Sequence, residues 1–473
     1  MIGGKFEDEL KLFCEKINSI KENEIHILVS ANPDGISAGS ILADSLIKNN
    51  VKVSFRVIPN DTYEISGARR DDCFYIFIDF PSESMLKFQK TFDNGIFINH
   101  DLISENHLDQ INEDFLNPSK YGIKGNKEIS SSGISYLLST KLNGKNSNLI
   151  NLAIVGALSE KQDIGQNRSF VGINSEIISV AQENGLLKID TGLMITCKNS
   201  APLPEAMAST LTPFIYGITG NKENCQKIFR NVAFDNLKNK WRIYLNFSED
   251  EKAIVLDSLS KFIAISSKNV PENIDKYLIG NSYIFPHEDI DSIVYDAREF
   301  VLTLEACIRY KKFGVGFAIC LGERNRLFLE AEKMNYDLKK ELINYISKIF
   351  NEKWRIFEDD ACIFVNAEGI LREDMIEFVS LILSQTITFN NKLLVIRTVT
   401  KDGNCKITCI KCVGYRYEYN LVDLVKEDLL EIGGYLISEI QSNYVSCIIP
   451  YHRIDNFLSK LKDGIIFCVS NRN

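Results

Sequence analysis

Residues 25–39 constrain the fold more than any other part of this chain. An apolar run over residues 25–29 ends in a polar turn at residues 30–35, and a helix start rich in small residues follows. A strand, a loop and a helix in this order are typical of an open α/β sheet, in which ligands bind at the carboxyl ends of the strands. The turn alone is weak evidence of a site, because most Asp-Gly turns are only turns.

Three later segments show the same pattern, an apolar run that ends in or leads to polar residues. They are residues 74–80, which include Asp79, residues 95–101, which end in Asn99, His100 and Asp101, and residues 151–158, which lead to Glu160. Residues 51–57 alternate in polarity like a strand, residues 7–22 have helical spacing, and the serines at 130–132 make a good helix start. Strands that alternate with helices over about 180 residues predict a mostly parallel, doubly wound α/β domain.

Four side chains with metal-binding chemistry follow these segments, each at or just beyond the end of what we interpret as an apolar strand. They are Asp34, Asp79, His100 and Glu160. Carboxylates and one imidazole at a single sheet edge suit Mn²⁺ or Mg²⁺. The alternative for each residue alone is a solvated loop position, but four on successive segments favour a site.

The remaining chain predicts two further parts, so that we divide it into residues 1–185, 186–350 and 351–473. The middle part is mainly helical, with the strongest helical spacing at residues 292–311 and 328–350. The last part returns to an α+β pattern, in which residues 392–397 and 406–410 flank an Asp-Gly turn and predict a hairpin.

Composition excludes several classes of protein. The net charge of −9 argues against a protein that coats nucleic acid through overall charge, although it leaves room for a local basic groove. The 12 cysteines are scattered, and only Cys405, Cys409 and Cys412 cluster, without a fourth ligand for zinc, so we expect buried strand cysteines. No apolar run of about 18 residues and no secretory start are present, which predicts a cytoplasmic protein with no membrane contact.

The order of these motifs resembles the DHH phosphoesterase superfamily, and within it the archaeal RecJ-like proteins known as GINS-associated nucleases. The resemblance covers nearly the whole chain and includes three further segments, at residues 117–122, 296–300 and 314–324. It implies that residues 1–185 form a DHH domain and that residues 351–473 form the DHH-associated domain, which binds the nucleic-acid substrate in this family.

The chain departs from the active family at most positions that carry the chemistry. The first motif, His-x-Asp-x-Asp-Gly in the family, has Ser30 and Asn32 in place of its His and first Asp. The triplet Asp-His-His, from which the superfamily takes its name, is Asn99-His100-Asp101 in this chain. Glu160 replaces the Asp of the fourth motif. The glycine-rich segment of the C-terminal domain survives only as Gly433 and Gly434, a degenerate remnant of the nucleic-acid site.

By this resemblance, the losses fall mainly on one of the two metal positions. The first position maps to Ser30, Asn32 and Asp79, which leaves one strong ligand. The second maps to Asp34, Asp79, His100 and Glu160, which keeps a possible site for one Mn²⁺ or Mg²⁺. Hydrolysis of a phosphodiester by two metals needs one ion on the attacking oxygen and one on the leaving oxygen. No catalytic set is intact.

Three interpretations of function follow. The first is a catalytically inactive structural subunit of the archaeal replicative helicase, bound to the GINS complex and the MCM helicase, and similar to the RecJ-derived cell-division-cycle protein of eukaryotes. The second is a residual exonuclease on single-stranded DNA or RNA that uses the one retained ion. A phosphodiesterase for small phosphoesters or cyclic dinucleotides is a third reading, disfavoured by the missing C-terminal glycines.

Overall fold

The chain divides into two compact units in a computed structural model, which describes residues 4–20, 24–59, 65, 73–92, 94–103, 110, 112–142, 147–266, 273–417, 419–440 and 443–470. The first unit combines Met1–Gly192 with Gly280–Tyr336, and the second combines Leu193–Ile279 with Asp337–Asn473. Both units are therefore built from segments far apart in the sequence. The boundaries expected near residues 185 and 350 stay predictions.

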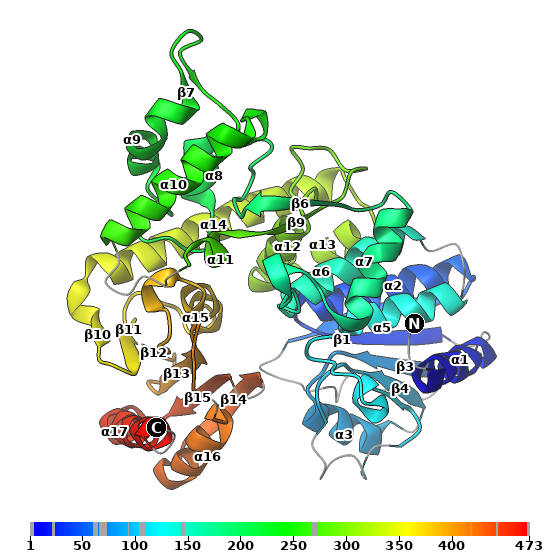
Figure 1. Ribbon diagram of the computed structural model, residues 1–473. Coiled ribbons are helices and arrows are strands. Elements are labelled where there is room, and N and C mark those ends of the chain that lie inside the picture. Colours follow the sequence, from blue (N-terminus) through cyan, green and yellow to red (C-terminus); the bar gives the residue numbers. More distant parts are fainter. Residues whose placement is uncertain are drawn as a thin grey trace. The chain divides into compact units, whose positions relative to one another are not determined.

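A five-stranded parallel sheet forms the centre of the first unit, in the order β2-β1-β3-β4-β5. Its strands β1, β3 and β4 are labelled in Figure 1. Its strands are β1 (Glu24–Ser30), β2 (Val53–Ile58), β3 (Cys73–Ile78), β4 (Gly95–Ile98) and β5 (Phe115–Leu116). Every neighbouring pair is parallel, which confirms the predicted fold class. In a doubly wound sheet of this order, successive strands are added on one side of β1 and then on the other. The strand order therefore reverses between β1 and β3, and ligands bind in the crevice beyond the carboxyl ends of those two strands.

Helices cover both faces of this sheet. They are α1 (Gly4–Ser19), α2 (Pro33–Lys48), α3 (Ser82–Thr91), α5 (Ser131–Leu142), α6 (Ile150–Ser159), α7 (Gly172–Glu183), α12 (Ala297–Arg309) and α13 (Phe313–Cys320). The helices α2, α5 and α6 pack on one another, α12 packs on α6 and α2, and α13 packs on α2. On the other face, aromatic side chains of α3, β3 and β4 share one core.

The prediction of a strand at residues 151–158 is wrong, because these residues lie in α6. Seven consecutive residues of this helix, from Leu152 to Leu158, are buried, so it has no polar face that would reveal a helical period. A short apolar run without such a face cannot be assigned to a strand or a helix from periodicity. Glu160 consequently follows a helix and not a strand.

The middle of the chain is mainly helical, as predicted. Its helices are α8 (Leu203–Ser209), α9 (Lys222–Ala233), α10 (Glu249–Ser266), α11 (Asp275–Leu278) and α14 (Arg326–Asn351). Two two-stranded sheets accompany them. One pairs β6 (Lys188–Leu193) with β9 (Ile279–Ile284), and the other pairs β7 (Phe234–Asp235) with β8 (Lys240–Trp241). Among the described residues, no helix is both long and apolar enough to cross a membrane.

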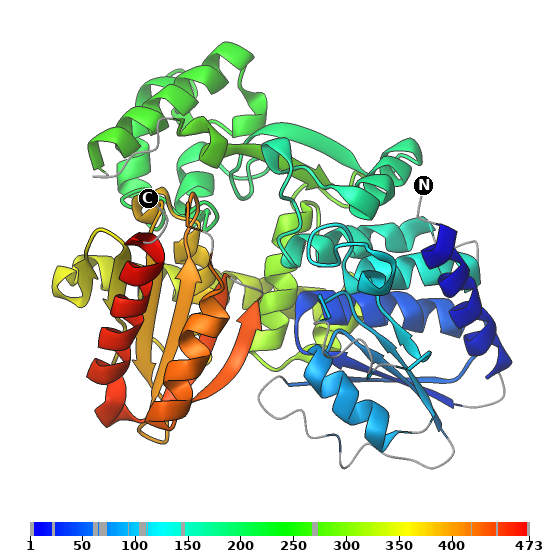
Figure 2. The same ribbon diagram turned by 60° about the horizontal axis from the view of Figure 1, so that its bottom comes forward.

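A six-stranded mixed sheet forms the rest of the second unit, in the order β10-β11-β12-β13-β15-β14. Its strands are β10 (Ile356–Glu358), β11 (Cys362–Asn366), β12 (Leu393–Val399), β13 (Cys405–Lys411), β14 (Tyr435–Ile440) and β15 (Tyr444–Ile449). The helices of this part are α15 (Ile376–Ser384), α16 (Leu421–Ile432) and α17 (Ile454–Ser470). The antiparallel pair β12 and β13 confirms the predicted hairpin. Figure 2 shows α16 and α17, in orange and red, against one face of the sheet, where their side chains form a core with β13 and β15.

The clustered cysteines are buried, as predicted, although only Cys405 and Cys409 belong to this core and Cys412 directly follows β13. Cys405, Cys409 and Cys412 are buried free thiols. Cys405 and Cys409 lie on the face of β13 that packs against α16 and α17. Burial raises the pKa of the Cys405 thiol to about 11, so this thiol is protonated and unreactive at neutral pH.

Candidate metal centre

Three of the predicted ligands meet at the carboxyl ends of β1, β3 and β4. Asp34 is in the first turn of α2, Asp79 directly follows β3, and His100 lies two residues beyond β4. Their ligand atoms all lie within 4.8 Å of one another, and all three side chains are buried. Asp79 has a φ of +64°, a conformation that Asp tolerates better than most residues, and its backbone N–H donates to the Ile98 carbonyl oxygen at 2.9 Å.

The Asp34 carboxylate binds the amino end of α5. Its Oδ2 accepts a hydrogen bond from the Ser131 N–H at 2.8 Å, and its Oδ1 accepts one from the Ser132 N–H at 3.0 Å. A carboxylate is favourable at this end of a helix, where N–H groups lack partners within the helix. Gly156 of α6 faces the same carboxylate so closely that a Cβ there would lie 2.1 Å from Oδ1.

His100 lies between the carboxylates. Its Nδ1 is 3.1 Å from Asp79 Oδ1 and 3.6 Å from Asp34 Oδ2, and its Nε2 is 3.7 Å from Glu160 Oε2. Burial by itself would lower the pKa of His100, but its interactions with Asp79 and Glu160 raise that pKa well above its ordinary value. Burial and the nearby Asp79 raise the pKa of Asp34 to about 6, and burial also raises that of Asp79.

Ser131 is a residue of this site that the sequence interpretation assigned only to a helix start. Its hydroxyl donates to Asp79 Oδ1 at 2.6 Å and also lies 3.0 Å from His100 Nδ1. The three consecutive serines at residues 130–132, where α5 begins, were the available signal, since a helix start needs only one such side chain for capping. Ser131 therefore links α5 to the side chains of two strand ends.

Asn32 occupies the space beside Asp79 and makes two hydrogen bonds there. Its Oδ1 accepts from the Gly35 N–H at 2.6 Å, which caps α2, and its Nδ2 donates to Asp79 Oδ2 at 2.7 Å. The cap fixes the orientation of the amide, because only the oxygen can accept from a backbone N–H. The amide nitrogen therefore points at the carboxylate from the place where the resemblance puts a metal ligand.

The other positions that depart from the active family lie nearby, and two of them brace the loop after β4. Asn99 Nδ2 donates to the Phe80 carbonyl oxygen at 2.6 Å, and its Oδ1 accepts from the Asp101 N–H at 2.6 Å. The Asp101 side chain is exposed. Ser30 is the last residue of β1 and is buried.

Gly433 and Gly434 lie in the second unit and have structural roles of their own. Gly433 ends α16 with a φ of +74°, which favours glycine. A Cβ on Gly434 would lie 2.8 Å from side-chain atoms of Leu429 and Ile449, so this position packs too closely for a larger residue. A role of these glycines toward nucleic acid stays a prediction.

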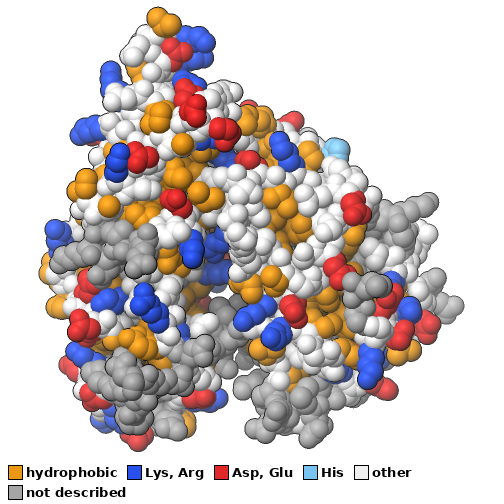
Figure 3. All heavy atoms as spheres, viewed as in Figure 1, with side chains coloured by type: hydrophobic (Ala, Val, Ile, Leu, Met, Phe, Trp, Pro, Cys, Tyr) orange, Lys and Arg blue, Asp and Glu red, His pale blue; other side chains and the backbone are white. Residues whose placement is uncertain are grey.

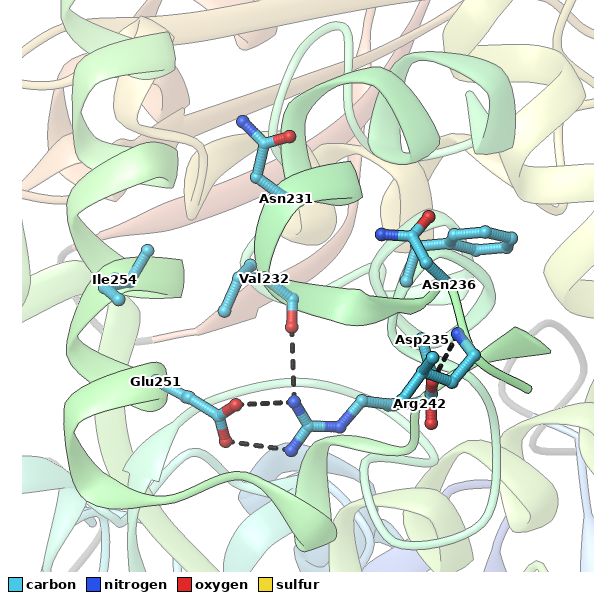
Figure 4. Close-up of a pocket in the computed structure, with 9 residues that line it drawn as sticks. Asn231, Val232, Asp235, Asn236, Arg242, Glu251 and Ile254 are labelled. Atoms are coloured by element: carbon cyan, nitrogen blue, oxygen red, sulfur yellow. Dashed lines mark hydrogen bonds and ion pairs between the residues drawn. The ribbon is translucent and has the colours of Figure 1, made fainter. Parts of the chain in front are cut away.

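A hollow of about 570 Å³ opens in the second unit between α9, α10 and the β7–β8 hairpin (Figure 4). Arg242 points into it, and its guanidinium donates to both Glu251 oxygens, at 2.5 and 2.8 Å. This hydrogen bonding lowers the pKa of Glu251 to about 2. Arg242 and Glu251 thus form an ion pair with each other, and this pair connects α10 to the hairpin.

The donor set fits one metal position better than the other. Asp34, Asp79 and His100, with Glu160 beside His100, offer carboxylate oxygens and one imidazole, a set that suits Mn²⁺. At the first position, the Asn32 Nδ2 is a hydrogen-bond donor and cannot ligate a cation. Among the described residues, the second position thus offers a fuller set of metal ligands than the first.

Comparisons with known proteins agree with this architecture. No family model matches the chain. An uncharacterized protein of Methanocaldococcus jannaschii is 24% identical over 332 residues, which are 69% of this chain and 70% of that protein. CDC45 from Entamoeba histolytica is 12% identical, with a TM-score of 0.65 over 97% of this chain and 99% of CDC45. RecJ from Thermus thermophilus in complex with Mn²⁺ is 11% identical, with a TM-score of 0.55 over 99% of this chain and 55% of RecJ.

The two structural likenesses extend over both units and not over the parallel sheet alone. They confirm the resemblance to RecJ-like proteins at the level of the fold. The chain spans nearly all of CDC45 but about half of RecJ. This protein therefore has the fold of RecJ and CDC45, over nearly the whole length of CDC45.

Proposed function

We propose that this protein is a catalytically inactive RecJ-like protein that acts as a structural subunit of the archaeal replicative helicase, together with GINS and MCM. The observation that carries the proposal is the hydrogen bond from Asn32 Nδ2 to Asp79 Oδ2 at 2.7 Å. The amide N–H donates to the Asp79 carboxylate from the place of a metal ligand, and this hydrogen bond stabilises the carboxylate without neutralising its charge.

The chemistry of phosphodiester cleavage explains why this substitution matters. In a two-metal site, one ion activates the attacking oxygen and the other stabilises the leaving oxygen. The resemblance assigns one ion to the positions of Ser30, Asn32 and Asp79, and Asn32 holds its donor toward that space. Because Asn32 also caps α2, the amide cannot turn its oxygen toward a cation without losing the cap. Two-metal hydrolysis is then unsupported.

The remaining groups support retention of one ion. Asp34, Asp79 and His100 hold their ligand atoms within 4.8 Å, and Glu160 lies 3.7 Å from His100. A Mn²⁺ or Mg²⁺ ion held here would relieve the repulsion between two buried carboxylates, which stabilises the fold without requiring turnover.

The role beside GINS and MCM rests on the extent of the likeness to CDC45 and on the resemblance read from the motifs. The surface also suits protein partners more than bulk nucleic-acid coating, since acidic and basic side chains are interspersed on the face in Figure 3 and the net charge is −9. Such a role places the protein with the chromosome in the cytoplasm.

Recovery of partners is the direct test of this proposal. The tagged full chain, expressed at its natural level, should co-purify GINS and MCM from nuclease-treated extract of its own organism. Nuclease treatment removes proteins that are linked only by DNA. Absence of both complexes from the eluate, with the bait intact, contradicts the structural role.

A residual exonuclease is the second candidate, and the intact Asp34, Asp79 and His100 cluster favours it. Incubation with Mn²⁺ and end-labelled single-stranded DNA or RNA tests this function, with Asp79→Ala as the control. Cleavage by the wild-type chain that Asp79→Ala abolishes would establish the nuclease. Cleavage that survives in Asp79→Ala would indicate a contaminating enzyme.

A further inference from the structure

A second group of metal-binding side chains lies at the opposite end of the parallel sheet, and we propose that it is a site for Zn²⁺. The group consists of Glu24, His26 and Cys73. Glu24 begins β1 and Cys73 begins β3, so both lie at the amino ends of parallel strands. The candidate metal centre lies beyond the carboxyl ends of the same strands, and the two sites are therefore separate.

The register of the sheet brings the three side chains together. Glu24 pairs with Cys73 between β1 and β3. Glu24 and His26 are two residues apart on β1, so their side chains leave the same face of the sheet. Parallel pairing alone thus assembles a carboxylate, an imidazole and a thiol on one surface.

The distances are those of groups able to share one ion. His26 Nε2 lies 2.9 Å from Cys73 Sγ and 3.9 Å from Glu24 Oε1, and the three ligand atoms all lie within 4.8 Å of one another. Zinc bonds of about 2.0 Å to nitrogen and 2.3 Å to sulfur would separate Nε2 and Sγ by roughly 3.5 Å in a tetrahedral site. Entry of the ion therefore requires the pair to open by about half an ångström.

The imidazole is held in the orientation that such a site needs. His26 Nδ1 forms a hydrogen bond with the Ser54 hydroxyl, which comes from the neighbouring strand β2. The ring of His26 also stacks on Tyr75, with the ring centroids 5.5 Å apart. A partner on the other ring nitrogen is the usual support of a metal-ligating histidine, because it fixes which nitrogen faces the metal.

The ligand types select zinc over the ions of the candidate metal centre. A thiolate with an imidazole and one carboxylate suits Zn²⁺, whereas Mn²⁺ and Mg²⁺ prefer oxygen ligands. His26 and Cys73 are buried, but the Glu24 side chain is 39% exposed and offers a path from solvent. Three protein ligands leave the fourth position of a tetrahedral zinc for water.

Cobalt substitution distinguishes this site from the candidate metal centre. The tag-free full chain is stripped with a chelator and titrated with Co²⁺ and then Zn²⁺, while the absorption of cobalt bound to thiolate is recorded. We expect one equivalent of Co²⁺ with a thiolate band, displaced by one equivalent of Zn²⁺. Cys73→Ser and His26→Gln should abolish the band.

Matched variants exclude indirect effects. Cys14→Ser removes another buried thiol of the first unit, which bonds the Leu138 carbonyl oxygen, and Asp34→Asn alters the other site; both should keep the band. Glu24→Gln, at a partly exposed position, should weaken Zn²⁺ binding about tenfold or more without unfolding the sheet. Cobalt binding without a thiolate band, or a band that persists in Cys73→Ser, would overturn the proposal and leave the pair as a buried thiol–imidazole hydrogen bond.

Discussion

Asn32→Asp is the substitution that best tests whether an amide replaces a metal ion in this fold. It removes the hydrogen bond from Asn32 Nδ2 to Asp79 Oδ2 and sets a second carboxylate 2.7 Å from the first, while the oxygen that caps α2 is kept. The two charges have no cation between them unless one is added. The change thus restores a ligand at the cost of the apo protein's stability.

Two calculations give a similar loss in the free energy of unfolding for Asn32→Asp. Charges about 4 Å apart repel by about 4 kcal/mol at an effective dielectric constant near 20. Protonation of the introduced carboxyl at pH 7 instead costs about 4 kcal/mol relative to the unfolded chain, where its pKa is ordinary, and this cost limits the loss of stability. Asn32→Asp should therefore lower the free energy of unfolding by about 3–4 kcal/mol, a large share of the roughly 5–15 kcal/mol typical of folded proteins.

Urea unfolding at pH 7, followed by circular dichroism with a chelator present, measures this loss. Asn32→Ser is the matched control, because it keeps a capping oxygen but adds no charge, and it should cost about 1–3 kcal/mol. The double variant with Asp79→Asn removes one of the two charges and should recover most of the loss.

Addition of Mn²⁺ provides the second half of the test. An ion at 100 times its dissociation constant stabilises the folded state by about 2.7 kcal/mol, and the gain should be larger in Asn32→Asp than in the wild-type chain. The reasoning is refuted if Asn32→Asp and Asn32→Ser are equally stable without metal, or if Mn²⁺ leaves the gap between Asn32→Asp and the wild type unchanged.

Three further predictions concern packing, pH and metal. Gly156→Ala places a Cβ 2.1 Å from Asp34 Oδ1, so we expect a loss of about 1–3 kcal/mol in thermal unfolding; a wild-type melting temperature would contradict the close contact. Arg242 lowers the pKa of Glu251 from 4.5 to about 2, so the stability that this pair contributes is present above pH 4.5 and is lost as the pH falls toward 2. Glu251→Gln should accordingly differ most from the wild type above pH 4.5 in denaturation curves, and a constant difference down to pH 2 would sink this assignment. Glu160→Gln should weaken Mn²⁺ binding in calorimetry, whereas an unchanged affinity would place the ion away from His100.

The sequence predicted the parallel sheet well because its central strands are continuous apolar runs with polar ends. Such runs are typical of strands buried on both faces, and β1, β3 and β4 are buried along nearly their whole length. The same reasoning failed at α6, whose apolar run has no polar face. Strand β14 was not predicted; it begins directly after Gly433 and Gly434, which the resemblance assigned to a degenerate motif.

At the candidate site, residue types were predictable but their interactions were not. The positions of Asp34, Asp79 and His100 followed from the ends of three segments, and the structure brings them together. The second hydrogen bond of Asn32 depends on how β1 and β3 are placed, which no local pattern encodes. The link made by Ser131 depends in the same way on where α5 begins relative to the sheet.

The divided first unit has a consequence for synthesis of the protein on the ribosome. Helix α2, which carries Asp34 in its first turn, is covered partly by α12 and α13, and these emerge only after the whole inserted stretch Leu193–Ile279. A nascent chain thus exposes apolar surface of α2 until Cys320, the last residue of α13, has left the exit tunnel, and chaperones have that interval in which to bind. A fragment cut at Gly192 would retain the five strands yet keep this surface permanently open to water.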